Sequence, residues 1–210
     1  MKKLVVVGNG MAGVACVEQI LKYRNDFDIT IFGDETHVNY NRIMLSSVLA
    51  GEKAADDIVL NGIDWYQKND ISARLGVRVM KVDSDRKVVI DDDGGTTSFD
   101  KLILATGSSA FIPPIEGVDK KNIHVFRTLD DTRQLMEKSR PGCRAVVIGG
   151  GLLGLEAARG LQAQGCDVTV VHLMETLMDR QLDLAGGSYL RRQMESLGIR
   201  VLLQKQTRRS

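Results

Sequence analysis

Leu4-Val5-Val6-Val7-Gly8-Asn9-Gly10-Met11-Ala12-Gly13 is the stretch from which the fold is predicted. Its four successive apolar residues are typical of a buried parallel strand. The three glycines predict a tight turn into a helix, whose apolar residues recur at helical spacing as far as Leu21. Glycines in this order let a pyrophosphate approach the backbone, and the free N–H groups at the helix N-terminus attract its charge. The stretch therefore predicts a dinucleotide-binding unit.

The same pattern occurs a second time, in Ala145-Val-Val-Ile-Gly149-Gly-Gly151-Leu-Leu-Gly154. A second apolar strand follows each glycine motif, at 28–32 and at 166–171. One such motif is weak evidence, but two copies in their strand–turn–helix context favour nucleotide binding over glycine turns without a ligand. The predicted fold class is α/β, with two Rossmann-like units in a three-layer architecture.

A crossing between two domains is predicted at Phe111-Ile-Pro-Pro-Ile-Glu-Gly117, because its prolines cannot continue a central strand. The expected domains are therefore residues 1–117 and 118–210. The second unit has three predicted strands, whereas a doubly wound domain usually has about five or six. We expect this domain to be incomplete in the chain, or its missing strands to lie on another segment. Unpaired strand edges would then favour self-association into a homo-oligomer.

The composition excludes several classes of function. The formal net charge is +1 and no run of Lys or Arg exceeds two residues, which argues against a nucleic-acid-binding surface. No apolar run approaches the roughly 20 residues of a membrane span, and the run after Met1-Lys-Lys is too short for a secretion signal. The three cysteines, Cys16, Cys143 and Cys166, form no Cys-x-x-Cys motif and no paired framework. We expect them to pack in the core of a cytoplasmic protein.

Several residues near the ends of predicted strands are candidates for nucleotide contacts. Asp34 and Glu35 lie roughly 20 residues beyond the first glycines, where an acidic residue binds the adenosine ribose; a solvated turn is the alternative. Arg42 is equally consistent with a phosphate contact and with an ordinary surface loop. Ala105-Thr106-Gly107 ends another buried strand, and small residues there permit close approach of a ligand.

The second strand of the second unit ends in His172 rather than in Asp or Glu. A histidine there is more consistent with a strand-end residue whose hydrogen bonds are satisfied than with a catalytic role. It predicts weak discrimination between NADH and NADPH, with a preference for NADH because no cluster of arginines directly follows the strand. Arg180, further on, either neutralises a phosphate or is solvated.

Three predictions concern local structure outside the glycine motifs. Thr128 is expected to cap a helix that runs through Lys138. Trp65 and Tyr66 are expected to pack in the core rather than to stack on a cofactor. The acidic run 91–93 is not a calcium loop, because no Glu follows at the required spacing, and no metal site is predicted.

Taken in order, these motifs resemble the flavoprotein reductases with two dinucleotide-binding domains, which include ferredoxin, rubredoxin and disulfide reductases. Three stretches are more specific: residues 40–51 (Tyr-Asn-Arg-Ile-Met-Leu-Ser-Ser-Val-Leu-Ala-Gly), Asp64-Trp-Tyr66 and residues 172–183. They are most similar to the N-terminal part of the large subunit of NAD(P)H-dependent assimilatory nitrite reductases. The resemblance extends to about Lys205.

The resemblance implies that the first unit binds FAD and the second binds NAD(P)H. It assigns FAD contacts to Gly8, Gly10, Met11, Ala12, Gly13, Asp34, Glu35, Arg42, Ser47, Val79, Ala105, Thr106 and Gly107. It assigns nicotinamide-cofactor contacts to Gly149, Gly151, Leu152, Leu153, Gly154 and His172. Ser47 stands where many ferredoxin reductases have Lys. No residue is assigned as a general acid or base, because the cofactors carry the chemistry.

The implied activity is hydride transfer from NAD(P)H to FAD, followed by electron delivery to an acceptor in nitrate assimilation. The acceptor would be a sirohaem and iron–sulfur module, or a small iron–sulfur protein, neither of which this chain contains. No pair of redox cysteines follows the first unit, which argues against disulfide reductase chemistry. The alternatives are a ferredoxin- or rubredoxin-type reductase and a truncated, non-catalytic nucleotide-binding fragment. We expect this chain alone to bind FAD weakly or not at all, and to have low activity.

Overall fold

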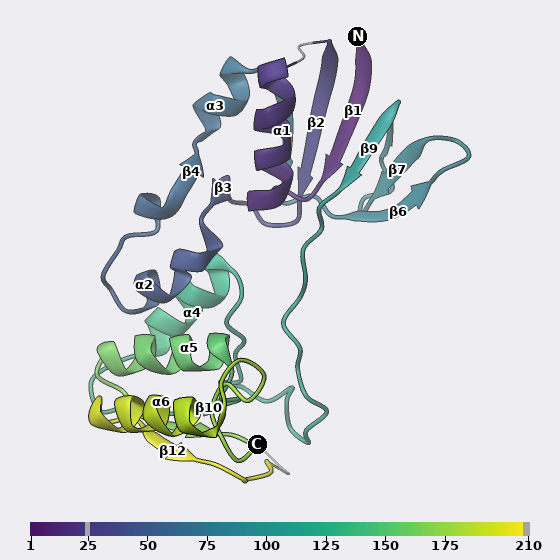
Figure 1. The fold of residues 1–210 in the computed structure, drawn as a ribbon. Helices are drawn as coiled ribbons and strands as arrows, with labels where there is room; N and C mark the ends of the chain where they lie inside the picture. The colour runs from purple at the N-terminus through teal and green to yellow at the C-terminus, as the bar shows by residue number, and fades with distance from the viewer. Residues whose placement is uncertain (24–25, 208–210) are drawn as a thin grey trace. The chain divides into compact units, whose positions relative to one another are not determined.

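The computed structural model describes residues 1–23 and 26–207. These residues form two compact units, each built on its own parallel sheet (Figure 1). Unit 1 consists of Met1–Arg42 and Ile58–Ser108, and unit 2 of Ile43–Asp57 and Ser109–Ser210. Each contains a parallel sheet with helices, which confirms the predicted α/β class. Within the described ranges, no helix has the length and apolar character needed to cross a membrane.

Unit 1 is built on a four-stranded parallel sheet with the strand order β5-β2-β1-β9. A separate antiparallel sheet has the order β6-β7-β8, and β3 pairs with β4. The elements of the unit are β1 (Lys2–Val7), α1 (Met11–Tyr23), β2 (Phe27–Gly33), β3 (Asn39–Tyr40), β4 (Val59–Asn61), α3 (Ile63–Lys68), β5 (Ile71–Leu75), β6 (Val79–Asp83), β7 (Val88–Asp91), β8 (Thr96–Ser98) and β9 (Lys101–Leu104). Short 3-10 turns at Arg42–Met44 and Asp56–Ile58 flank the segment that belongs to unit 2.

The strand β1 is buried on both faces, which explains its unbroken apolar run. Leu4 and Val6 share one core cluster with Val17 of α1. Val5 and Val7 share another with Val89 of β7. Unit 1 therefore has three layers: helix, parallel sheet and antiparallel sheet. Each fully buried Val stabilises the folded state by roughly 1.5–3 kcal/mol relative to exposure.

The register of the parallel sheet brings the candidate site residues to one end of the sheet, where the strands have their carboxyl ends. Val7 lies opposite Phe32 of β2 and Leu104 of β9. The hydrogen bonds continue one residue further: Gly8 N–H donates to the Phe32 carbonyl at 2.8 Å, and Ala105 N–H to the Val7 carbonyl at 2.8 Å. The first glycine turn and the small residues after β9 therefore start at the same carboxyl end of the sheet.

Unit 2 is built on a three-stranded parallel sheet with the order β10-β11-β12. A core cluster joins this sheet to residues of α2, α5 and α6. The elements of the unit are α2 (Leu45–Leu49), α4 (Leu129–Lys138), β10 (Arg144–Ile148), α5 (Leu152–Ala163), β11 (Asp167–Val171), α6 (Leu184–Ser196) and β12 (Arg200–Leu202).

The helix α2 packs with unit 2, although it lies between two segments of unit 1 in the sequence. Leu49 is fully buried in the unit 2 core, and a Cβ on Gly160 would lie 2.6 Å from its side chain. Gln164 Nε2 donates to the Leu49 carbonyl at 2.9 Å, and Arg159 pairs with Glu52 at 3.2 Å. The boundaries of the compact units thus differ from the predicted domain boundary at residue 117. That boundary was drawn between two cofactor-binding domains, and this assignment stays a prediction.

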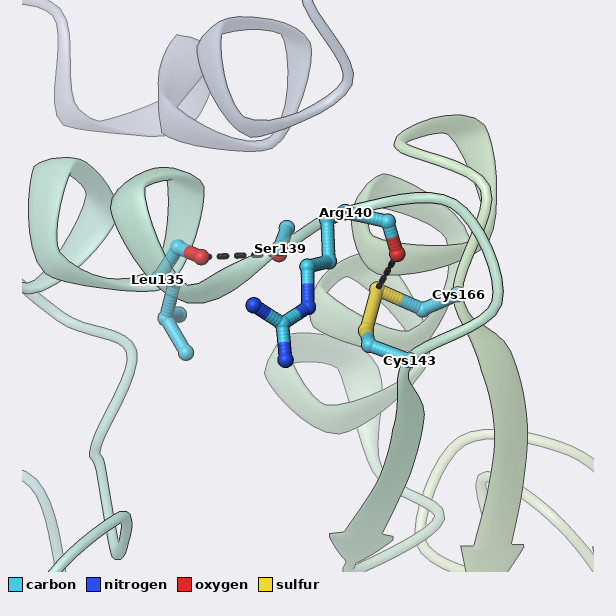
Figure 2. The surroundings of a disulfide bond; sticks show 5 residues. All are labelled: Leu135, Ser139, Arg140, Cys143 and Cys166. Atoms are coloured by element: carbon cyan, nitrogen blue, oxygen red, sulfur yellow. Dashed lines mark hydrogen bonds between the residues drawn. A yellow bond between two sulfur atoms is a disulfide. The ribbon is translucent and has the colours of Figure 1, made fainter.

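Cys143 and Cys166 form a disulfide bond, so the prediction that the cysteines form no pair is wrong for these two (Figure 2). They directly precede β10 and β11, whose register pairs Arg144 with Asp167. That register sets the two Cα atoms 4.8 Å apart, within the usual range for a disulfide. Spacing along the chain gives no sign of this proximity, because it arises from the pairing of the strands. Cys16 is a free cysteine.

Candidate functional site: two glycine turns

The first glycine turn is closed by contacts that only glycine permits. A Cβ on Gly13 would lie 2.1 Å from the Gly8 carbonyl oxygen, so α1 packs directly against the turn. Gly8 has φ +119°, and a Cβ there would lie 2.0 Å from the carbonyl oxygen of Ala105. The turn, the start of α1 and the end of β9 therefore meet at one point, which brings three of the predicted FAD residues together.

Space remains open above this turn, as a bound phosphate requires. A Cβ on Gly10 would meet no atom of the described residues within 4 Å. The N–H groups at the start of α1, including those of Met11 and Ala12, have no helical partner because they precede the first i−4 carbonyl. The first turn of α1 carries no acidic side chain. The arrangement fits an anionic pyrophosphate at the helix N-terminus.

A buried hydrogen-bond network holds Asn9 between the two glycines. The Tyr66 hydroxyl donates to Asn9 Oδ1 at 2.7 Å and accepts from Asn39 N–H at 3.3 Å. Asn39 Nδ2 donates to the Asn9 carbonyl, and Asn9 Nδ2 to the His37 carbonyl, both at 3.3 Å. Tyr66 packs in the core, as predicted. Its role in positioning the turn was not predicted, and a polar residue between two glycines was the only signal of it in the sequence.

The acidic turn after β2 is already engaged by side chains of unit 1. Glu35 accepts from Arg42 at 2.5 Å and from the Tyr40 hydroxyl at 2.7 Å. Asp34 pairs with Arg78 at 3.1 Å, and both of these side chains are more than half exposed. An exposed pair of this kind contributes little to stability. Asp34 is thus the more accessible of the two carboxylates for a ribose hydroxyl.

Two other predicted FAD residues lie apart from the glycine turn. Val79 opens β6 and packs against the cluster that contains Phe32 and Val7. Ser47 lies on α2, in the other compact unit. Its predicted FAD contact therefore has no support from the geometry of unit 1, and it stays a prediction.

The second glycine turn repeats the geometry of the first. Gly149 has φ +116°, and a Cβ on Gly154 would lie 2.1 Å from its carbonyl oxygen. Within the part of the chain that the structure describes, a Cβ on Gly149 or on Gly151 would meet nothing within 4 Å. Gly151 is the N-cap of α5 and no side chain caps the helix, whose first residues, Leu152 and Leu153, are exposed. This helix N-terminus also fits a phosphate group.

His172 lies against the second turn, with both ring nitrogens engaged. Nδ1 accepts the Gly150 N–H at 3.1 Å, and Nε2 lies 3.1 Å from Asp179 Oδ1. A Cβ on Gly150 would lie 2.8 Å from the imidazole ring. His172 is therefore a strand-end residue whose hydrogen bonds are satisfied, as the sequence predicted. The pairing with Asp179 was missed, because nothing in the sequence pattern links the two positions.

A cavity of 380 Å³ in unit 2 opens beside α5. Its walls are mainly apolar and include Leu155 and Met178, with Ser47 and Glu156 also on the lining. Burial raises the pKa of the Glu156 carboxyl above its ordinary value. Glu156 was not among the residues predicted from the sequence; it follows the glycine motif on an otherwise apolar stretch of helix.

Comparisons with known proteins connect this geometry to a family. The pyridine nucleotide-disulphide oxidoreductase model matches residues 2–210. The chain is 50% identical to the "Assimilatory nitrate reductase electron transfer subunit" of Bacillus subtilis, and 52% identical to "Nitrite reductase [NAD(P)H]" of the same organism. Each match covers 98% of this chain, but only 27% and 26% of those relatives.

A solved structure, the "covalent putidaredoxin reductase-putidaredoxin complex", superposes with a TM-score of 0.89 at 28% identity. The match covers 98% of this chain and 50% of that one. The chain thus spans about a quarter of the length of the curated relatives it matches. With its two repeated glycine turns, this chain belongs to the pyridine nucleotide-disulphide oxidoreductase family.

Proposed function

We propose that this chain is the NAD(P)H-oxidising front end of a nitrite reductase large subunit. FAD is bound by the first glycine turn and its domain, residues 1–117, and NAD(P)H by the second, residues 118–210. When bound, NAD(P)H supplies a hydride that FAD accepts, before electrons pass to an acceptor. Two relatives support this, one named as a nitrite reductase and one as an electron transfer subunit of an assimilatory nitrate reductase, because each match covers 98% of this chain.

The observation that carries the proposal is the open space at the start of each helix, which accompanies a repeated close contact between the third and first glycines. In both units a Cβ on the third glycine would lie 2.1 Å from the first glycine's carbonyl oxygen. In both units, a Cβ on the middle glycine would meet no atom of the described residues within 4 Å. Packing accounts for the close contact, but not for the open space beside the free N–H groups at the start of each helix. Space beside free N–H groups suits a phosphate.

The residues of this chain bind and orient the cofactors. For FAD we propose the residues of the first turn, with Asp34, Glu35, Arg42, Ser47, Val79 and the run 105–107. For NAD(P)H we propose the second turn with Leu152, Leu153 and His172. The acceptor is proposed to be a sirohaem and iron–sulfur module or a small iron–sulfur protein outside this chain. We also propose a cytoplasmic homo-oligomer.

A pair of matched variants tests the proposal. Gly10→Val and Gly151→Val each place a side chain in open space, so both variants should keep the parent's circular dichroism spectrum. FAD and NADH are titrated separately into the parent and each variant, and binding is followed by fluorescence. We expect Gly10→Val to lose FAD binding alone, and Gly151→Val to lose NADH binding alone. Unchanged binding of both cofactors in both variants would leave the glycines as turns only.

A further inference from the structure

The carboxyl end of β11 lacks the acidic side chain that dinucleotide-binding units usually present to the adenosine ribose. His172 occupies that position, and its ring is held against the second glycine turn. The structure brings a carboxylate to the same place from seven residues further along the chain: Asp179 Oδ1 lies 3.1 Å from His172 Nε2.

The hydrogen bonds of His172 determine which oxygen of this carboxylate is engaged. Nδ1 accepts the Gly150 N–H, so the hydrogen of the neutral ring is assigned to Nε2. Nε2 then donates to Asp179 Oδ1. Among the described residues, no hydrogen bond involves Asp179 Oδ2, and the side chain is 27% exposed. One carboxylate oxygen is thus fixed by the histidine, and the other is open to a ligand.

The segment that carries Asp179 is itself docked on the glycine turn. Met178 N–H donates to the Gly150 carbonyl at 2.9 Å, and Met178 has φ +53°. Leu177 is fully buried, and a Cβ on Gly150 would lie 2.6 Å from its side chain. The position of Asp179 is therefore set by the same turn that holds the phosphate site, and not by a free loop.

We propose that Asp179, oriented by His172, is the acceptor for the adenosine ribose hydroxyls of the nicotinamide cofactor, and that it makes this unit prefer NADH. The inference rests on the proposed function of the second glycine turn. The open oxygen of the Asp179 carboxylate has two lone pairs and can accept hydrogen from the ribose hydroxyls of NADH. With NADPH, the 2′-phosphate adds a charge of about −1.5 to −2 beside Asp179, and like charges at that distance repel. Asp179 thus supplies, from the following loop, the acid that the strand end lacks.

The test measures dissociation constants of NADH and NADPH for the parent, Asp179→Asn and Glu175→Gln. Asp179→Asn removes the charge and keeps the shape. We expect it to raise the Kd of NADH about tenfold and to lower that of NADPH, so that the preference for NADH falls at least tenfold. Glu175→Gln, an exposed neighbour on the same segment, should change neither constant. Thermal unfolding checks that Asp179→Asn is folded.

His172 is a positioning residue in this scheme, and a double-mutant comparison tests that role. His172→Gln should reduce the preference for NADH in the parent background, but not in the Asp179→Asn background. Equal weakening of both cofactors by Asp179→Asn, or no change, would overturn the inference while leaving the proposed function intact. So would a parent that prefers NADPH, which would assign the 2′-phosphate to the adjacent Arg180. A parent that binds neither nucleotide would instead overturn the proposed function.

Discussion

Tyr66 donates its hydroxyl hydrogen to Asn9 Oδ1 at 2.7 Å, so a side chain of α3 holds the residue between the first two glycines of the turn. The same hydroxyl accepts the Asn39 N–H at 3.3 Å. Burial raises the pKa of the Tyr66 hydroxyl, against the smaller effects of its hydrogen bonds. The group therefore stays protonated, and stays a donor, at neutral pH.

Tyr66→Phe tests this link between α3 and the glycine turn. The variant leaves Asn9 Oδ1 and Asn39 N–H without their buried partner, which should reduce the free energy of unfolding by about 1–3 kcal/mol. Urea unfolding measures this, and an FAD titration should show weaker binding because Asn9 is less firmly held. Tyr23→Phe is the matched control, since Tyr23 is 82% exposed. A Tyr66→Phe variant as stable as the control would contradict the network.

Gly13→Ala and Gly154→Ala test the repeated close contact. Each variant puts a Cβ 2.1 Å from a backbone carbonyl oxygen, so the helix must move away from the turn. Overpacking of this kind costs about 1–3 kcal/mol or more, and it should appear as a lower unfolding midpoint. Gly10→Ala and Gly151→Ala are the controls, because their Cβ atoms meet nothing within 4 Å. Equal stability of the test and control variants would show that the helices do not approach so closely.

Local sequence signals predicted those features of the fold that depend on a few neighbouring residues. The glycine turns followed from residue type and spacing. The Thr128 cap was also correct: Asp131 N–H donates to Thr128 Oγ1 at 3.1 Å, and the Asp131 carboxylate accepts the Thr128 N–H at 2.8 Å. In these cases the physical cause, a tight approach or an unpaired helix N–H, lies within a few residues of its sequence signal.

Features that depend on tertiary register were not predictable. The Cys143–Cys166 bond requires the alignment of β10 with β11. The placement of α2 depends on Leu49 fitting beside Gly160, more than 100 residues away in the chain. His172 was expected to have its hydrogen bonds satisfied, but its partner Asp179 is brought there by the docking of a loop. Residue type predicts that a partner is needed, and only packing decides which residue it is.

The disulfide between Cys143 and Cys166 should stabilise unit 2. It closes a loop with a sequence separation of 23, and restricting such a loop in the unfolded chain contributes about 3 kcal/mol. We expect a reducing agent to lower the denaturation midpoint of the parent, but not that of a Cys143→Ala/Cys166→Ala double variant. Alkylation followed by mass spectrometry should find one modified cysteine in the unfolded parent without reductant, and three after reduction. Three modified cysteines without reductant would show that the purified protein holds a dithiol.

Glu156→Gln should stabilise the chain at neutral pH. Burial raises the pKa of the Glu156 carboxyl, so the folded state binds its proton more tightly than the unfolded state does. Stability from this group is therefore greatest below the ordinary pKa of about 4.5 and is lost as the pH rises through the raised value. Glutamine is uncharged throughout and avoids that loss. The unfolding midpoint of the Glu156→Gln variant should exceed that of the parent at pH 7. The difference between the two midpoints should shrink as the pH falls toward 4.5. Glu175→Gln, on an exposed side chain, serves as the control. A difference that is constant with pH would mean that the substitution acts through packing in the cavity rather than through the charge.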